Sequence, residues 1–370
     1  MDNLMQYIDI NPIVAKAKEL DCPYIAIIGG KGTGKTYGCV DYAIRDFFAS
    51  GETRPFAYVR RYDKTFTKNL CGNLVGSHRQ DIINLSKGKY NTAELYGKIY
   101  ELMRKTTTEK GMDKRQNRKT IGYCRSLNNV ESETGDDKGE ISCIIYDEFL
   151  TRGVELKDEF LKIQTCHNNL IRNRGGKSDG GRFIPMFLLG NTVSKDSAVA
   201  EQFGIRMRDI KRGLNVFENK AHKARIVLYY TEETARNVEA ANTYYDRFEN
   251  SRINMITRGD WVLGSYKTAP LDMMYTKGFT AKMYYNRIAV NVTLGFYGQN
   301  PFIIVRKPSE KYDIAISPYC GKSNIQLIPK IFIRCVLLGN LYVENSDIGE
   351  DFRDICKHIA NGKEIVNAIG

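Results

Sequence analysis

Several features that would assign this 370-residue chain to a particular class are missing from its sequence. It has only four histidines, and none of its nine scattered cysteines belongs to a CxxC pair. These shortages argue against a structural zinc site and a disulfide framework, and they indicate a reducing compartment. Cys166 and His167 are adjacent but have no further ligands in the pattern, so we expect them to be ordinary helix residues.

Long hydrophobic runs are also missing. The longest apolar stretches, near residues 184–189 and 331–339, fall far short of the ~20 residues that a membrane-spanning helix needs. The first residues, Met1-Asp2-Asn3-Leu4, lack the charged-then-apolar pattern of a secretion signal. We therefore expect a soluble, intracellular protein without a membrane partner.

Acidic residues are fewer than basic ones. The chain has 55 lysines and arginines against 43 aspartates and glutamates, which gives a net charge of +12. Such a balance favours a polyanionic partner, and nucleic acid is the usual one. Charge alone leaves the question open, because a basic surface also serves solubility.

The chain does contain a complete phosphate-binding loop of the GxxxxGKT type. It reads Gly29-Gly30-Lys31-Gly32-Thr33-Gly34-Lys35-Thr36. Its glycines let the backbone turn tightly and direct successive N–H groups inward at the positive end of the following helix. Lys35 is expected to reach the β- and γ-phosphates of ATP, and the Thr36 hydroxyl to ligate Mg²⁺.

The segments on either side of the loop have the character that this motif requires. The apolar run 24–28 directly precedes it, and Val40, Ala43, Ile44 and Phe47 recur at helical spacing after it. Because strand, loop and helix agree, we predict that residues 29–36 bind ATP.

A second motif, Ile144-Ile145-Tyr146-Asp147-Glu148, ends an apolar run in two acids. A carboxylate that ends a buried strand beside the phosphate loop can hold Mg²⁺, while the adjacent carboxylate polarises the attacking water. We assign the first role to Asp147 and the second, catalytic role to Glu148.

The arrangement of these motifs favours the hydrolytic, motor-like branch of P-loop ATPases, the ASCE or RecA-like type. Glu148 directly follows Asp147, and a further strand, 56–60, lies between the loop and the acid pair in the chain. Small-molecule kinases, which need to exclude water, are the alternative.

Two further polar motifs are candidates for roles in hydrolysis. Asn191 follows an apolar run, and motor ATPases place such an amide against the γ-phosphate and the attacking water; it could equally end the strand and do no more. Arg172 and Arg174 stand at an expected helix end, where in a ring either can reach a neighbouring subunit's site. Favourable pairing with the helix C-terminus explains these arginines equally well.

Together these motifs resemble those of the DNA-packaging ATPases of phi29-like bacteriophages, which are terminase-like ASCE P-loop motors. The segments that carry the likeness are Tyr58-Val59-Arg60-Arg61-Tyr62, Tyr146-Asp147-Glu148-Phe149, Arg172-Asn173-Arg174 and Gly190-Asn191-Thr192-Val193-Ser194. The likeness is good over about 24–63 and 141–215, poor over 64–140, and only general in the C-terminal part.

The resemblance implies a homopentameric ring at the portal vertex of an empty prohead, where ordered ATP hydrolysis drives double-stranded DNA inward. It implies that Arg172 is a trans-acting arginine finger, that Asn191 is a coupling residue, and that Arg60 or Arg61 forms the arginine-rich segment. It also implies a location in the host cytoplasm, transient contact with the portal and a structural RNA, and absence from the mature virion.

Two basic segments are candidates for gripping DNA. Residues 104–119 and 206–225 each contain seven basic residues against two acidic ones. The residues that we take as DNA contacts are Lys105, Lys114, Arg115, Arg118, Lys119, Lys211 and Arg212. Their contacts should be to phosphates, because a translocating motor must ignore sequence, although a solvated loop is an equal explanation for each segment.

The distribution of apolar runs predicts an α/β fold. Runs at 24–28, 56–60, 141–146 and 183–189, with helical segments between them, indicate a mostly parallel sheet flanked by helices. The alternating pattern over 90–127 indicates an inserted hairpin or a small antiparallel extension.

We expect three parts in the chain: a P-loop ATPase domain at 1–230, a helical linker at 231–265, and a smaller α+β domain at 266–370. The resemblance implies that the last part is a vestigial RNase H-like nuclease. The strands expected at 279–285 and 301–306 contain no Asp or Glu, which agrees with lost nuclease chemistry.

The leading hypothesis is therefore an ATP-driven packaging motor. A ring helicase or DNA-transfer ATPase with the same chemistry is one alternative. A nucleotide-gated nucleic-acid-binding scaffold with little turnover is another, from a different functional class.

Overall fold

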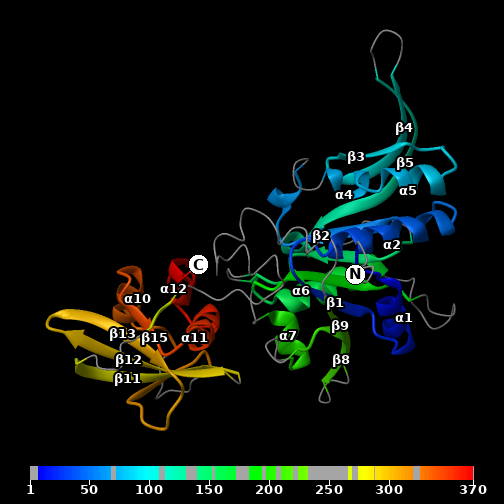
Figure 1. Cartoon of the computed structure of the whole chain (residues 1–370). Helices are drawn as coiled ribbons and strands as arrows, with labels where there is room; N and C mark the ends of the chain where they lie inside the picture. The colour runs from blue at the N-terminus through cyan, green and yellow to red at the C-terminus, as the bar shows by residue number, and fades with distance from the viewer. Residues whose placement is uncertain are drawn as a thin grey trace, which may run out of the picture. The chain divides into compact units, whose positions relative to one another are not determined.

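The computed structural model divides the chain into two compact units (Figure 1). Met1–Leu150 with Leu156–Trp261 make up the first unit, and Val262–Gly370 with Thr151–Glu155 make up the second. The structure describes residues 7–67, 72–107, 113–130, 140–151, 155–171, 183–193, 197–205, 210–219, 224–231, 266–268, 274–286, 288–319 and 326–369. The predicted linker lies outside these residues except for Thr231, and the boundaries at 230 and 266 stay predictions.

A nine-stranded sheet in the order β3-β4-β5-β2-β6-β7-β1-β9-β8 forms the centre of the first unit. The six strands from β5 to β9 in this order run parallel, and the flanking pairs are antiparallel. The strands are β1 (Tyr24–Gly29), β2 (Phe56–Arg60), β3 (Thr92–Tyr96), β4 (Ile99–Thr107), β5 (Asp113–Ser126), β6 (Ile144–Asp147), β7 (Met186–Asn191), β8 (Gly213–Asn219) and β9 (Ala224–Tyr230). The predicted α/β fold with a mostly parallel sheet is confirmed.

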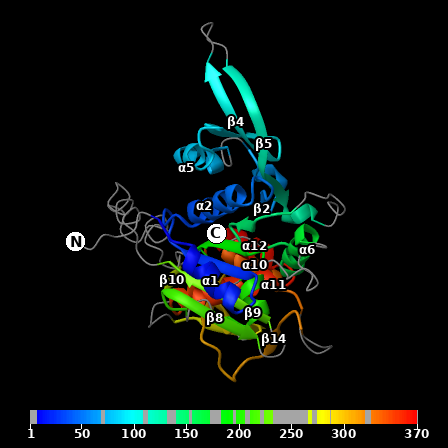
Figure 2. The same ribbon diagram turned by 90° about the vertical axis from the view of Figure 1, so that its right-hand side faces the viewer.

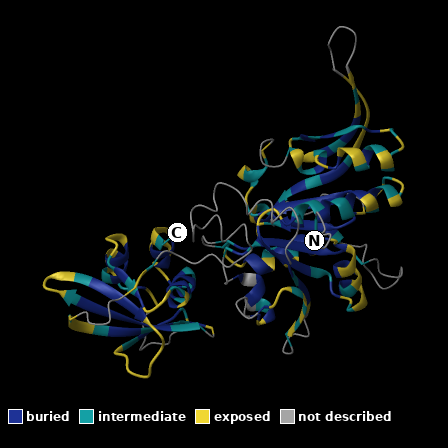
Figure 3. Ribbon diagram, viewed as in Figure 1, coloured by how far each residue is buried: buried dark blue, intermediate teal, exposed yellow. Residues whose placement is uncertain are grey.

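Helices cover both faces of this sheet. They are α1 (Asn11–Glu19), α2 (Lys35–Ala49), α4 (Asn73–Gly76), α5 (Arg79–Leu85), α6 (Glu159–Ile171) and α7 (Ala198–Phe203), with short 3-10 turns at Asp63–Thr65 and Leu127–Asn129. Ile25 and Ile27 of β1 pack on the side of α1 and α2, whereas Ala26 and Ile28 pack on the side of α6 and α7. The period of two in a strand therefore gives each face its own apolar core (Figure 3).

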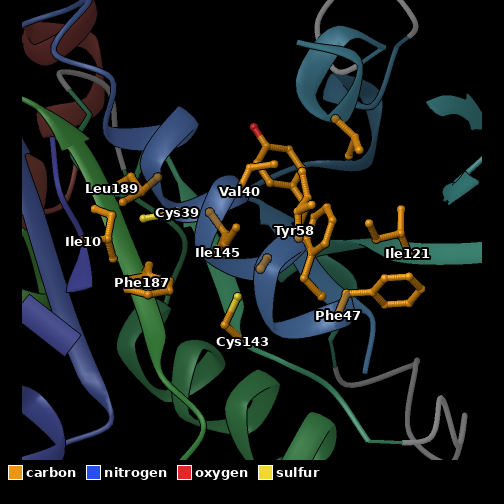
Figure 4. Packing of buried hydrophobic residues seen from close by; sticks show 14 of the residues in the cluster. Ile10, Cys39, Val40, Phe47, Tyr58, Ile121, Cys143, Ile145, Phe187 and Leu189 are labelled. Carbon is orange, nitrogen blue, oxygen red and sulfur yellow. The ribbon is translucent and has the colours of Figure 1, made fainter. Parts of the chain in front are cut away.

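The packing on the α2 side is dense. Val40 and Phe47 of α2 lie in one buried cluster with Tyr58 of β2, Ile145 of β6 and Phe187 of β7 (Figure 4). All but Tyr58 have no exposed surface. Residues at helical spacing after the loop thus fix α2, and with it the start of that helix, against the parallel strands.

The strand that separates the P-loop strand from the acid-pair strand is β7. In the chain, 56–60 lies between the two motifs, but in the sheet β2 lies on the far side of β6. Chain order does not reveal this, because a crossover connection can pass over neighbouring strands. The register pairs Gly29 of β1 with Asn191 of β7, so these two motif residues end adjacent strands.

The expected antiparallel extension is present as strands β3, β4 and β5. β4 and β5 project from the rest of the unit as a long hairpin (Figures 1 and 2). β5 also continues into the parallel core, where Gly122 to Ser126 pair with β2. The basic segment 206–225, read as a single stretch in the sequence, instead contributes to a second hairpin, β8–β9, at the opposite edge.

The second unit has a six-stranded mixed sheet in the order β10-β15-β13-β12-β11-β14. Its strands are β10 (Lys267–Thr268), β11 (Thr276–Tyr285), β12 (Ile288–Tyr297), β13 (Asn300–Arg306), β14 (Ile314–Ile316) and β15 (Leu341–Val343). Helices α10 (Lys330–Leu337), α11 (Ser346–His358) and α12 (Gly362–Ile369) pack with it in one apolar core. The predicted smaller α+β domain is confirmed, and none of these six strands contains Asp or Glu.

Two expectations from the composition concern cysteines and membranes. The seven cysteines in the described part of the chain are all buried and free of disulfides, including Cys166, which lies with His167 on α6. Among the described helices, none is long and apolar enough to span a membrane.

Candidate active site

The glycine-rich loop connects β1 to α2 in conformations that need glycine. Gly29, Gly32 and Gly34 have φ values of +149°, +89° and +81°. A Cβ on Gly29 would lie 1.7 Å from the hydroxyl oxygen of Thr231, and one on Gly34 would lie 2.6 Å from a ring carbon of Tyr7. Both the backbone angles and the close neighbours therefore exclude larger residues at Gly29 and Gly34.

Thr231, the first residue of the predicted linker, is part of this arrangement. It is buried, and its N–H donates to the carbonyl of Ile28 at 2.8 Å. In the structure Thr231 extends β9 alongside the P-loop strand.

The Lys35 ammonium folds back over the loop. Nζ donates to the carbonyl oxygens of Gly30 at 2.6 Å and of Gly29 at 3.1 Å, and it lies 3.4 Å from the Thr33 hydroxyl. Burial lowers the pKa of Lys35 from 10.5 to about 8, and the nearby Asp147 carboxylate opposes part of this shift. The loop carbonyls thus hold a cation at the place where the phosphates of ATP would need one.

Asn191 contacts the same ammonium. Its Oδ1 accepts a hydrogen bond from Lys35 Nζ at 3.1 Å. The parallel pairing of β7 with β1 makes this possible, because it brings the ends of both strands to one edge of the sheet. Asn191, proposed as a coupling residue, is thereby linked directly to the phosphate-binding lysine.

Asp147 ends β6 at the same edge. Its Oδ2 accepts a hydrogen bond from the Tyr58 hydroxyl at 2.7 Å. Burial raises the pKa of this carboxyl, while the Tyr58 hydrogen bond and the charges of Arg60 and Lys35 oppose the rise. Asp147 and Thr36 line one cavity, and their carboxylate and hydroxyl oxygens are ligands that suit Mg²⁺.

Glu148 has a strained backbone and an exposed side chain. Its φ is +64°, and 60% of its side chain is exposed. The carboxylate forms an ion pair with Arg60, whose own side chain is only 9% exposed. A non-glycine residue at positive φ is uncommon and occurs often at functional sites, so this conformation supports a special role for Glu148.

Arg60 and Arg61, which the resemblance left as alternatives, have different surroundings. Arg61 forms two hydrogen bonds with Glu159 of α6, at 2.7 and 2.8 Å, and it donates to the carbonyls of Glu148 and Phe149. Glu159 also accepts from the Tyr146 hydroxyl at 2.8 Å. Arg61 therefore secures the backbone after the acid pair, whereas Arg60 contacts the acid pair itself.

A cavity of about 300 Å³ lies between the phosphate-binding loop and the ends of β6 and β7. The residues that line it are Tyr7, Lys31, Gly32, Gly34, Lys35, Thr36, Tyr37, Asp147, Glu148, Leu189, Gly190 and Asn191. Tyr7 and Tyr37 were not predicted to lie at the site, and their rings stack with centroids 4.1 Å apart. Tyr37 directly follows the loop and could have been noticed, but nothing in the sequence marks Tyr7.

The predicted arginine finger is not part of this geometry. α6 ends at Ile171, and Arg172 and Arg174 lie outside the described residues. The placement of a finger at either position stays a prediction.

The predicted DNA contacts of the first basic segment lie on the β4–β5 hairpin, and several have partners there. Arg115 and Arg118 both lie over the ring of Tyr96, at 5.7 and 5.1 Å from its centroid. Arg118 also pairs with Glu101, and Glu94 lies within 3.5 Å of Arg115 and Lys105. Lys114 and Lys119 are exposed. Glu94 and Glu101 therefore offset part of the positive charge of the hairpin.

The predicted contacts of the second segment, Lys211 and Arg212, are exposed just before β8. Arg212 donates to the carbonyl of Thr231 at 3.0 Å and lies over the Tyr230 ring. The structure places these two residues at the opposite edge of the sheet from the long hairpin.

Comparisons with known proteins agree with this architecture. No protein-family model matches the chain, and no curated protein matches it in sequence. Among solved structures, the chain is similar to the packaging motor of bacteriophage phi29, with 16% identity, a TM-score of 0.53, and coverage of 95% of this chain and 99% of that one.

Two further structures show weaker similarity. They are the Phi-28 gp11 DNA packaging motor (12% identity, 95% of this chain and 97% of that one, TM-score 0.48) and the N-terminal domain of the phi29 DNA packaging ATPase (18% identity, 62% and 97%, TM-score 0.45). The likeness to the phi29 motor assembly extends over both units. It shows that the chain has the fold of a bacteriophage packaging motor.

Proposed function

We propose that this protein is an ATPase that packages viral DNA by driving double-stranded DNA into a prohead. The observation that carries the proposal is the convergence of Lys35, Asp147, Glu148 and Asn191 around one cavity at the carboxyl edge of a parallel sheet. In open α/β sheets, ligands bind at this edge. The shared fold with the phi29 packaging motor supports the proposal.

Each residue has a distinct part in this chemistry. The backbone of 29–36 cradles the phosphates, and Lys35 exchanges its loop carbonyl partners for phosphate oxygens. Thr36 and Asp147 would hold Mg²⁺, which would neutralise charge on the phosphates. Glu148 orients and deprotonates the attacking water, which requires its carboxylate to leave Arg60.

The response to the γ-phosphate would begin at Asn191. Lys35 Nζ donates a hydrogen bond to the Oδ1 atom of Asn191 at 3.1 Å. Any movement of the ammonium toward bound phosphate therefore changes that hydrogen bond. Asn191 lies at the end of β7, next to Thr192 and Val193, through which the change can pass to the rest of the unit. Coupling of hydrolysis to motion is part of the proposal.

The motor would work as a ring, a homopentamer by resemblance, in the host cytoplasm and transiently at the portal vertex, with the portal and a structural RNA as partners. Arg172 would complete the neighbouring subunit's site. Mixing Arg172→Ala with Lys35→Ala subunits should then recover part of the ATPase activity. Verified co-assembly without any recovery would contradict a trans-acting Arg172.

Stimulation of turnover tests the substrate. We expect ATP hydrolysis by the full chain to rise when proheads and double-stranded DNA are added together, and single-stranded DNA to have little effect. Stimulation by single-stranded DNA without proheads would favour a ring helicase or DNA-transfer ATPase. No turnover under any of these conditions would favour the nucleotide-gated scaffold.

A further inference from the structure

Three metal-ligating side chains outside the proposed active site converge between α2 and α5. They are Asp41 on α2, His78 directly before α5, and Asp81 in the first turn of α5. One ligand atom from each lies within 4.8 Å of those of the other two. His78 Nδ1 is 4.0 Å from Asp81 Oδ2.

His78 is the most deeply buried of the three side chains. Its side chain is completely buried, and no described residue forms a hydrogen bond with either of its ring nitrogens. The Tyr37 ring stacks on it, with centroids 3.9 Å apart and the planes 24° from parallel, which fixes the imidazole. A buried polar group without a partner is uncommon, and a bound ion is one of its explanations.

Although the few histidines and the scattered cysteines argue against a structural zinc site in the sequence, we propose that Asp41, His78 and Asp81 form a binding site for one Zn²⁺ ion. An imidazole nitrogen with two carboxylate oxygens suits Zn²⁺, whereas Mg²⁺ prefers oxygen ligands alone. Ligands of a tetrahedral Zn²⁺ stand about 3.4 Å apart, so the ligand atoms, which lie within 4.8 Å of one another, must approach by at most about 1.4 Å. The carboxylates, 26% and 35% exposed, have room to do so around the fixed ring.

Arg45 now lies between the two carboxylates. Its Nε is 2.8 Å from Asp41 Oδ2, and its Nη2 is 3.7 Å from Asp81 Oδ1. The Asp81 oxygen nearest His78 is the other one, Oδ2. Because a carboxylate offers about four lone-pair sites, each Asp can bind the ion and still contact Arg45, which is half exposed.

The ion would fasten α5 to the helix that begins at the phosphate-binding loop. Tyr37 and Asp41 are one turn apart on α2, and Tyr37 also lines the active-site cavity. Zn²⁺ would therefore stabilise the wall of that cavity from outside. This inference depends on the geometry of the three side chains and not on the proposed packaging activity.

Metal binding by the full chain tests the inference directly. After removal of bound metal with a chelator, equilibrium dialysis against Zn²⁺ without nucleotide should give one tightly bound equivalent. The bound Co²⁺ form should show visible ligand-field bands without a thiolate charge-transfer band, because no cysteine takes part. His78→Phe, which keeps a stacking ring, and Asp81→Asn should each lower Zn²⁺ affinity by more than roughly 100-fold, since changes merely around a site already cost 10- to 100-fold.

The matched control is His167→Phe, which replaces another buried histidine in the same unit and should keep full Zn²⁺ binding. Asp81 is partly exposed, so Asp81→Asn should fold normally, as circular dichroism would verify. Unchanged Zn²⁺ binding in His78→Phe and Asp81→Asn would overturn the inference. Failure of the wild type to bind Zn²⁺ at 100 μM, or a Co²⁺–thiolate band that marks a cysteine site, would do so as well.

Discussion

In the proposed mechanism, Glu148 is the side chain whose state decides whether the site can hydrolyse ATP. In the structure its carboxylate pairs with the nearly buried guanidinium of Arg60, and its backbone is held at positive φ. Tyr58 and Arg61 secure the neighbouring Asp147 carboxylate and the backbone after Glu148. The surrounding residues therefore fix the backbone of Glu148, whereas its exposed carboxylate can exchange Arg60 for another partner.

Replacing Arg60 tests this interpretation. Arg60→Gln should raise ATP turnover in the absence of DNA between about 1.4- and 5-fold, which corresponds to the ~0.2 to 1 kcal/mol of an ion pair whose carboxylate is open to solvent. Steady-state ATPase assays would measure it. The control is Arg54→Gln, which removes the arginine of an ion pair with Asp46 away from the site. A fall in turnover as deep as that of a Glu148 variant would show instead that Arg60 acts on the nucleotide.

Lys35 should make nucleotide binding depend on pH. Burial lowers its pKa to about 8 from 10.5, so the unfolded chain binds more protons between these values, and the stability of the nucleotide-free protein should rise with pH over this window. Bound phosphates would raise the pKa again. Binding of MgATP at pH 8.5 should therefore take up roughly 0.8 proton, against about 0.1 at pH 7.

Calorimetry in buffers of different ionisation enthalpy would measure this proton uptake. Lys31→Ala, which removes a neighbouring exposed lysine of the loop, should keep the difference between the two pH values. Equal proton uptake at both values would contradict the account of Lys35.

Single side chains also show how far the site could be predicted from the sequence. Lys35, Asp147 and Asn191 were identified because their motifs place them at strand or helix ends. Tyr7 and the Arg60–Glu148 pair were not, because these contacts join segments far apart in the chain and depend on the final packing. Arg172 cannot be judged, since it lies outside the described residues.

Among the elements, the β4–β5 hairpin is the best candidate for a DNA contact. It projects from the first unit, and Lys114 and Lys119 are exposed on it. The double variant Lys114→Ala/Lys119→Ala should weaken DNA binding and lower the slope of log K against log salt by about 1.8, or 0.9 for each phosphate contact. Binding titrations at several salt concentrations would measure this slope.

The control for the hairpin is Lys16→Ala/Lys18→Ala on α1, which removes the same charge elsewhere in the unit. An equal loss of slope in both double variants would indicate a general effect of net charge. No loss in the hairpin variant would exclude Lys114 and Lys119 from the DNA contact.

The elements themselves were predicted with unequal success. Four of the six parallel strands, β1, β2, β6 and β7, were evident because strands buried on both faces read as continuous apolar runs. The position of β7 between β1 and β6 was not, because strand order depends on crossovers that local patterns do not encode. The β8–β9 hairpin was not predicted, because the charged residues of 206–225 were interpreted as a basic surface.

At the scale of the whole molecule, the similarity to the phi29 packaging motor covers 95% of the chain and therefore includes both units. The first unit holds every described residue that we place in the ATPase site. The second contributes a mixed sheet whose strands have no acidic residue, which leaves it without carboxylates on its strands for nuclease chemistry.

The central claim is that ATP is hydrolysed in the cavity between the phosphate-binding loop and Asp147-Glu148, and that this hydrolysis drives DNA into a prohead. Glu148→Gln tests it most directly, because it keeps the shape of the side chain and removes the base. With proheads and double-stranded DNA present, this variant should bind MgATP as tightly as the wild type, lose at least about 100-fold in turnover, and package no DNA. Turnover within a few-fold of the wild type, or a wild type that binds ATP and never hydrolyses it, would contradict the account.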